Sequence, residues 1–207
     1  MRDAGWNVVF FHYRGAWGAE GNFSFTGSEQ DVTAVTQFLQ QPDNAKKFKV
    51  DIKKISYIGH SMGGHMAVAG MFDNPDVTCG VVYDGANIGV TFKSDDTKTQ
   101  DLWATYADSL FMLRGWSGTV SSEELTEKSE QLNLISRAHE IANRPILFIP
   151  ADSDVIPIAE INALVDAMRS VKGNRVSYTL IKDDHSFNNN RLKLLKVTKE
   201  FLNDNCR

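Results

Sequence analysis

Five short runs of apolar residues stand out along the chain, separated by segments that have a helical spacing of apolar and polar positions. The runs are rich in β-branched and aromatic residues, and most of them end at glycine or at polar residues. Near-continuous apolar runs of this length are typical of strands buried on both faces of a parallel sheet. The predicted strands cover residues 7–13, 54–59, 79–84, 145–150 and 176–181.

Amphipathic segments fill most of the gaps between these runs. In the first, apolar side chains from Val32 to Leu39 fall on one helical face, behind a candidate N-cap at Thr26 or Ser28. The predicted helices cover residues 28–39, 62–72, 159–171 and 191–202. Because strand and helix alternate, the sequence predicts an α/β fold with a mostly parallel sheet flanked by helices and joined by right-handed crossovers.

One connection is much longer than the others. Residues 87–143 separate the third apolar run from the fourth, and roughly 55 residues are too many for an ordinary loop. The segment has helical patterns of its own, around Trp103 and around Leu132, with a glycine-rich break between them. We therefore expect an inserted helical cap or lid within a single domain spanning residues 1–207. Ordinary surface helices unconnected with a substrate are the alternative.

Length and charge limit the classes of function. The chain has 207 residues, of which 42% are hydrophobic, so it is long enough to bury a substantial core. Its formal net charge is −4, and lysine and arginine are scattered along the sequence. Nucleic acid is therefore not an expected partner, because its binding surfaces are strongly basic.

The cysteine content and the hydropathy pattern bear on the compartment. The two cysteines, Cys79 in an apolar run and Cys206 near the end, form neither a disulfide framework nor a metal-ligand spacing. We interpret them as a buried thiol and a terminal thiol. No membrane span or signal peptide is recognisable, so a cytoplasmic location is the default expectation. A signal peptide stays possible if the natural chain begins further upstream.

The stretch "GHSMGG" places Ser61 between a predicted strand and a predicted helix. A sharp strand-to-helix turn needs residues without side chains, and we expect Gly59 and Gly63 to allow the strand and the helix to approach each other. The turn exposes the serine hydroxyl and puts it at the N-terminus of a helix. There the backbone NH of Met62 is the expected donor to an oxyanion.

A nucleophilic serine needs a base, and the base needs an orienting acid. His185 lies in a polar loop directly after the last predicted strand, where side chains converge at the carboxyl ends of a parallel sheet. Asp152 and Asp154 follow the fourth predicted strand, and both are candidates for the acid. The remaining histidines, His12, His60, His65 and His139, have no comparable placement.

The order serine, acid, histidine is typical of one fold. At these positions the sequence resembles the α/β-hydrolase superfamily, and it is most similar to prolyl oligopeptidase-like and esterase-like members. "GHSMGG" resembles the nucleophile elbow, "DDHSF" the histidine loop and "PILFIPADSD" the strand that ends in the acid. The register of this resemblance favours Asp154 over Asp152. The catalytic residues that it implies are Ser61, Asp154 and His185, with no metal or organic cofactor.

The resemblance also implies elements that these residues do not contain. Related proteins have a strand and an "HG"-type loop before the segment that corresponds to residues 7–13, and that loop donates the second oxyanion NH. Loss of one oxyanion donor typically lowers the rate by about 10²–10³-fold. In the usual strand order another strand separates residues 7–13 from residues 54–59. We therefore expect these two segments either to lie apart or to pair directly.

The glycine loop after the first predicted strand has a competing interpretation. Gly15, Gly18 and Gly21 follow an apolar run, as they would in a dinucleotide-binding motif. Their spacing is G-x-x-G-x-x-G instead of G-x-G-x-x-G, and the next helix begins too late to direct its NH groups at a pyrophosphate. A nucleotide site is therefore not expected.

Two functions remain. The first is a serine hydrolase that cleaves an ester or a peptide bond of a small substrate through an acyl-enzyme intermediate. The second is a truncated, noncatalytic hydrolase-like scaffold that binds a ligand or partner. The complete set of serine, acid and histidine favours the first function. The substrate and the oligomeric state are not indicated by the sequence.

Overall fold

The computed structural model describes residues 4–91, 97–152 and 155–206. Within them, a parallel sheet has the strand order β1-β2-β3-β4. Its strands confirm four of the five predicted ones, with shorter bounds. They are β1 (Ser56–His60), β2 (Cys79–Tyr83), β3 (Ile146–Ile149) and β4 (Val176–Tyr178).

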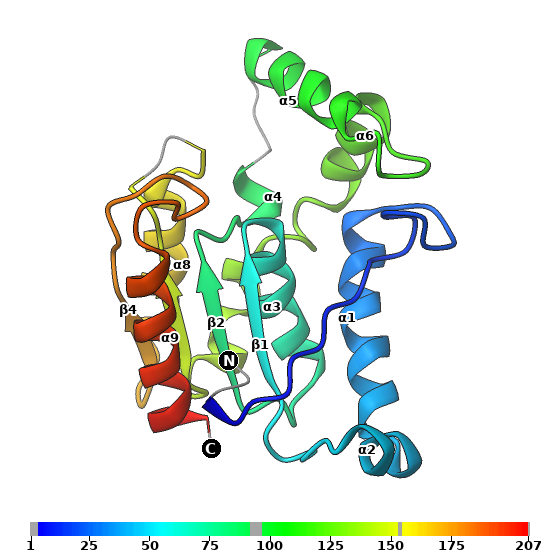
Figure 1. Cartoon of the computed structure of the whole chain (residues 1–207). Coiled ribbons are helices and arrows are strands. Elements are labelled where there is room, and N and C mark those ends of the chain that lie inside the picture. Colours follow the sequence, from blue (N-terminus) through cyan, green and yellow to red (C-terminus); the bar gives the residue numbers. More distant parts are fainter. Residues whose placement is uncertain (1–3, 92–96, 153–154, 207) are drawn as a thin grey trace.

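Helices cover both faces of this sheet (Figure 1). All four predicted helices are present. The N-cap of the first is Ser24 and not Thr26 or Ser28, because the Ser24 hydroxyl accepts the NH of Gly27 at 3.0 Å. The helices are α1 (Phe25–Gln40), α2 (Pro42–Phe48), α3 (Met62–Asp73), α4 (Ile88–Thr91), α5 (Thr97–Ser109), α6 (Gly118–Lys128), the 3-10 helix η2 (Leu134–Arg137), α7 (Ala138–Ile141), α8 (Ile158–Arg169) and α9 (Arg191–Asn205).

The core forms two apolar layers because side chains alternate across the strands. On β2, Val82 packs into the larger cluster with α3 and α8, while Val81 packs into the smaller cluster with α9. On β3, Phe148 and Leu147 divide in the same way. Both strands are thus buried on both faces, which explains why their sequences show no polar alternation.

Residues 7–13 do not form the predicted strand. β1 is an edge of the sheet in the described part of the chain, and residues 7–13 do not pair with it. A groove of about 580 Å³ lies between this segment, α1 and β1, and Val9, Phe11 and Ile58 are among the residues that line it. The apolar pattern is that of a strand, but among the described residues this segment forms no ladder with β1, which lies across the groove from it.

The sequence interpretation of the two cysteines as free thiols is wrong. Cys79, at the start of β2, and Cys206, after α9, form a disulfide with their Cα atoms 5.7 Å apart. Both residues are buried in the smaller core cluster. The bond attaches the end of α9 to the central part of the sheet. The cysteine content therefore no longer supports a reducing compartment.

Helices α5 and α6 stand beyond the carboxyl ends of β1 and β2 (Figure 1). They are attached to the body through α1. Glu124 of α6 accepts the backbone NH groups of Phe25 and Thr26 at 2.9 and 3.0 Å, so its carboxylate caps α1. The glycine loop adds an antiparallel bridge between Ala16 and Leu113. None of the helices in the described ranges is long and apolar enough to cross a membrane.

Candidate active site

Ser61 occupies the junction between β1 and α3 in a backbone conformation that few residues adopt. Its φ is 56° and its ψ is −122°. A Cβ atom at Gly59 would lie 1.8 Å from the carbonyl oxygen of Gly63, and one at Gly64 would lie 2.7 Å from the Cα of Gly85. These two glycines therefore permit the turn, as the sequence predicts for Gly59. A Cβ at Gly63 would meet no atom within 4 Å, so the clearance expected there is not needed.

The backbone around Ser61 is fixed by β2 and the loop that follows it. The NH of Ser61 donates to the carbonyl of Tyr83 at 3.0 Å, and the NH of Ala86 donates to the carbonyl of Ser61 at 3.2 Å. Met62 is the first residue of α3. The first NH groups of a helix lack intrahelical acceptors, so the Met62 NH has no acceptor within α3.

His185 is paired with a carboxylate that sequence reasoning missed. Its Nδ1 lies 2.6 Å from Oδ2 of Asp84, the residue directly after β2. The Asp84 side chain is fully buried, and the His185 side chain is 19% exposed. The predicted acid, Asp154, lies outside the described residues. Its alternative, Asp152, is exposed and lines an open cavity beside His185.

His60 brings the histidine loop against the serine turn. Its Nε2 donates to the backbone carbonyl of His185 at 2.7 Å, and the two rings lie 4.5 Å apart. Burial lowers the pKa of His60, an effect that the charge of His185 reinforces and the hydrogen bond to the His185 carbonyl opposes. The neutral ring carries its proton on Nε2, because a carbonyl only accepts.

His65 supports the same region from within the core. It is fully buried on α3, with Nε2 3.0 Å from a carboxylate oxygen of Glu29 on α1. Its Nδ1 accepts the backbone NH of Ile88, the first residue of α4, at 3.2 Å. Since Nδ1 is the acceptor, Nε2 carries the proton and donates to Glu29. His65 thus joins α1, α3 and the start of α4.

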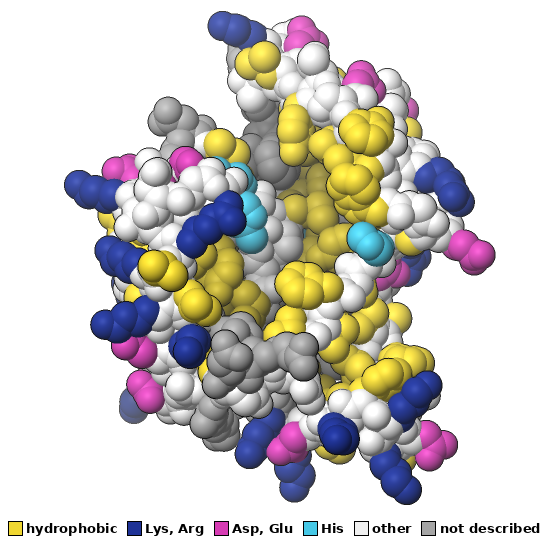
Figure 2. All heavy atoms as spheres, viewed as in Figure 1, with side chains coloured by type: hydrophobic (Ala, Val, Ile, Leu, Met, Phe, Trp, Pro, Cys, Tyr) yellow, Lys and Arg dark blue, Asp and Glu magenta, His cyan; other side chains and the backbone are white. Residues whose placement is uncertain are grey.

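Apolar side chains lie near the carboxyl ends of the strands. Figure 2 shows hydrophobic side chains gathered in a hollow between the part of the surface that carries α5 and α6 and the body of the molecule. An aromatic cluster joins the glycine loop to these helices, with Phe23 and Phe25 packed edge-on against Trp116 at ring distances of 4.9 and 5.0 Å. This surface suits an apolar group more than a charged one.

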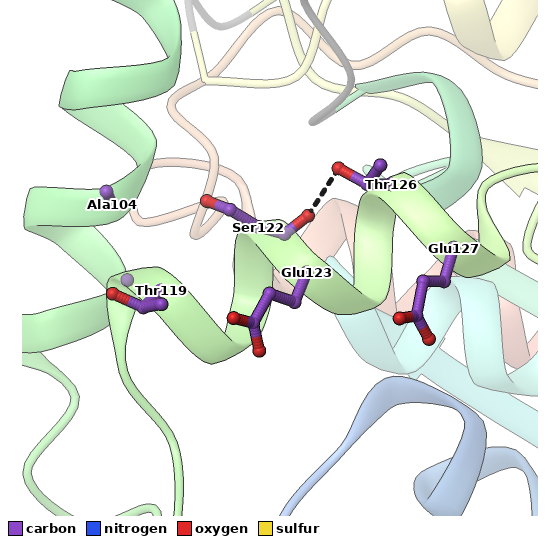
Figure 3. Close-up of a pocket in the computed structure, with 7 residues that line it drawn as sticks. Ala104, Thr119, Ser122, Glu123, Thr126 and Glu127 are labelled. Carbon is purple, nitrogen blue, oxygen red and sulfur yellow. Dashed lines mark hydrogen bonds between the residues drawn. The ribbon is translucent and has the colours of Figure 1, made fainter.

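Other cavities and clusters do not suggest further chemistry. An open pocket lies between α5 and α6, and Ala104 of α5 and Ser122, Glu123 and Glu127 of α6 are among the residues that line it (Figure 3). Ser61, Asp84 and His185 do not line it. Among the described residues, no three His, Cys, Asp or Glu side chains are grouped as a metal site would require. Gly15, Gly18 and Gly21 all have positive φ, so they serve the turns of their loop.

The sequence model of the BD-FAE family matches residues 1–162 of the chain. This chain belongs to the BD-FAE family. No curated protein sequence matches this BD-FAE member.

Solved structures show that this BD-FAE member has the α/β-hydrolase fold. An esterase of Pyrococcus furiosus superposes with a TM-score of 0.70 at 19% identity, covering 99% of this chain and 71% of the esterase. A monoacylglycerol lipase of Paleococcus ferrophilus gives a TM-score of 0.65 at 15% identity, over 97% of this chain and 84% of the lipase. The acylaminoacyl peptidase of Pyrococcus horikoshii gives 0.64 at 16% identity, over 92% and 31%.

A signal for Asp84 was present in the sequence of this BD-FAE member. Asp84 comes at the end of a buried apolar run, whereas Asp152 and Asp154 come a few residues after one. Asp84 also lies between Ser61 and His185 in chain order. The sequence prediction placed Asp84 inside the third apolar run, at residues 79–84, and the acid among the residues that follow the fourth run. The alternation along β2 does not indicate where the last side chain points, since the positive φ of Asp84 turns the chain there.

Proposed function

We propose that this protein is a serine hydrolase that cleaves a small ester or a short peptide through an acyl-enzyme intermediate. Ser61 attacks the carbonyl carbon and His185 accepts its proton. Met62 NH stabilises the oxyanion, and His185 then returns the proton to the leaving group. A carboxylate bound to Nδ1 of His185 holds the imidazole in the required tautomer. No metal or organic cofactor takes part in these steps.

The observation that carries this proposal is a strained serine turn whose preceding residue, His60, holds the loop of a carboxylate-bound histidine. A positive φ at a serine between strand and helix stores strain, which persists where it serves a function. His185, whose loop contacts the neighbouring His60, is bound to a buried carboxylate through Nδ1. That bond leaves Nε2 free to accept a proton. The esterase, lipase and peptidase folds of similar proteins agree with acyl transfer.

The apolar hollow beside α5 and α6 favours a substrate with an uncharged group. We infer that residues 87–143 act as a cap over the acyl or aromatic group of the substrate, since apolar side chains gather there. The backbone bridge between Ala16 and Leu113 and the cap of α1 by Glu124 hold this segment on the body. The cap then shapes a pocket without needing to open as a hinged lid.

The Ser61→Ala variant tests the proposal. We expect hydrolysis of a p-nitrophenyl ester to fall by more than about 10³-fold, because removal of a nucleophile removes the acyl-enzyme pathway. Labelling by a fluorophosphonate probe should be lost, while the far-UV circular dichroism stays unchanged. The Ser122→Ala variant, which alters a serine of α6 that lines the open pocket between α5 and α6, is the matched control. Turnover that survives in Ser61→Ala would exclude the proposed mechanism.

The noncatalytic alternative has one observation in its favour. The groove beside the β1 edge is unfilled by the described residues and is lined by apolar side chains of residues 7–13 and β1. A folded wild-type preparation that neither labels with the probe nor hydrolyses the ester would favour a binding role for this scaffold.

A further inference from the structure

The carboxylate that orients His185 can be identified from the end of β2. Asp84 follows Tyr83, the last residue of that strand, and has a φ of 38°. Its NH donates to the carbonyl of Ile149 on β3 at 2.9 Å, so its backbone is held by the neighbouring strand. A positive φ is uncommon for a residue other than glycine and is maintained only where the surroundings require it.

Both oxygens of the Asp84 carboxylate have defined partners. Oδ2 lies 2.6 Å from Nδ1 of His185, and Oδ1 accepts the backbone NH of Ala151 at 2.9 Å. The side chain is fully buried, where an ionised carboxylate requires such donors. The two bonds fix the direction in which the carboxylate faces, which is what an orienting acid must provide.

Asp84 is also connected to the nucleophile through the backbone. The residue before it, Tyr83, accepts the NH of Ser61 at 3.0 Å. Two residues after it, the NH of Ala86 donates to the carbonyl of Ser61 at 3.2 Å. Asp84 therefore lies between two residues that are hydrogen-bonded to Ser61, and these bonds, together with the bond to β3, fix the position of its backbone relative to the serine.

We propose that Asp84, and not Asp154, is the acid that positions His185, an inference that rests on the proposed serine hydrolase function. Nδ1 of an imidazole carries one proton, and that proton is donated to Asp84. A second carboxylate could not accept it with equal geometry. The order serine, acid, histidine is kept, but the acid comes from the strand next to the nucleophile strand. Asp84 acts through His185 and is a positioning residue.

The Asp84→Asn variant tests this role, with Asp154→Asn as the matched control. An asparagine keeps an oxygen for the Ala151 NH, while its amide donates to Nδ1 and moves the imidazole proton to Nε2, the wrong tautomer for a base. We expect kcat/KM for a p-nitrophenyl ester to fall by about 10³–10⁴-fold in Asp84→Asn. In Asp154→Asn it should stay within about threefold, because the control leaves the pair with His185 intact.

A proton NMR spectrum provides a readout that a structural role alone would not move. The Nδ1 proton in a short bond to a carboxylate gives a strongly deshielded resonance. We expect it in the wild type, in Asp154→Asn and in Ser61→Ala, and we expect its loss in Asp84→Asn and in His185→Gln. The spectra of the wild type, Asp154→Asn and Ser61→Ala still test the assignment if Asp84→Asn folds poorly.

The outcomes separate this inference from the proposed function. Loss of activity and of the resonance in Asp154→Asn, with both retained in Asp84→Asn, would overturn the assignment of Asp84 and leave the serine hydrolase intact. Full activity in both aspartate variants would also overturn it. If Ser61→Ala keeps its activity, the proposed function fails, and the resonance then reports only on the contact between Asp84 and His185.

Discussion

Gly59 and Gly63 both belong to the turn around Ser61, but their surroundings differ. A side chain at Gly59 would overlap the backbone of residues 63 and 64, which cannot move without displacing α3. At Gly63 there is open space, and the residue lies in the first turn of α3. Substitutions at the two positions therefore test whether a glycine of this motif is required because a side chain would overlap its surroundings.

We expect Gly59→Ala to lower the free energy of unfolding by about 1–3 kcal/mol or more, as overpacking against backbone does. Gly63→Ala should be neutral or should raise it by up to about 1 kcal/mol, because alanine favours helix over glycine. Urea unfolding followed by circular dichroism measures both. Equal losses in the two variants would contradict the contacts described for Gly59.

At the scale of residues, the sequence predicted the strand-to-helix turn at Ser61 and the loop that carries His185, because each follows from a local pattern of strand, turn and helix. Asp84 required the tertiary structure. An aspartate after a buried strand occurs more than once in this chain, and only the fold determines which one reaches Nδ1 of His185. The tautomers of His60 and His65 likewise depend on partners that are distant in sequence.

At the scale of elements, the apolar runs predicted β1 to β4, because each of those strands pairs with a neighbour in the sheet. The same pattern in residues 7–13 did not produce a strand, since a ladder needs a second backbone and the nearest strand, β1, does not pair with it. β4 is shorter than its apolar run, and its pairing resumes only in the isolated bridge between Ala151 and Ile181. An apolar run thus predicts that a segment is buried, but whether it forms a strand depends on a neighbouring backbone with which it can pair.

The disulfide between Cys79 and Cys206 gives an element-scale prediction for α9. It closes a loop with a sequence separation of 127, and its loss frees the end of α9 from β2. We expect Cys206→Ala to lower the free energy of unfolding by about 2–4 kcal/mol. Urea unfolding with and without a reductant measures this. Reductant should lower the wild-type midpoint and leave that of Cys206→Ala unchanged, and an unaffected wild type would contradict a disulfide that stabilises the fold.

At the scale of the whole molecule, the surface is asymmetric. The side of the sheet that ends at β1 carries apolar side chains which nothing in the described part of the chain covers. Phe10 is 93% exposed and Ile58 is 42% exposed, and Val8 and Val9 add to the same region. Edge strands with apolar neighbours are sites of association between chains, because their unpaired NH and CO groups accept another strand.

We therefore expect these 207 residues to self-associate through the β1 edge. Ile58→Lys should shift the protein toward the monomer and reduce the fluorescence of a bound apolar dye at least about twofold, because an edge lysine opposes strand addition. Leu192→Lys is the matched control, since Leu192 is 84% exposed on α9 and does not line the groove. Size-exclusion chromatography with light scattering reports the mass. If Leu192→Lys dissociates the assembly and Ile58→Lys does not, association involves the α9 side of the molecule and the groove is not its origin.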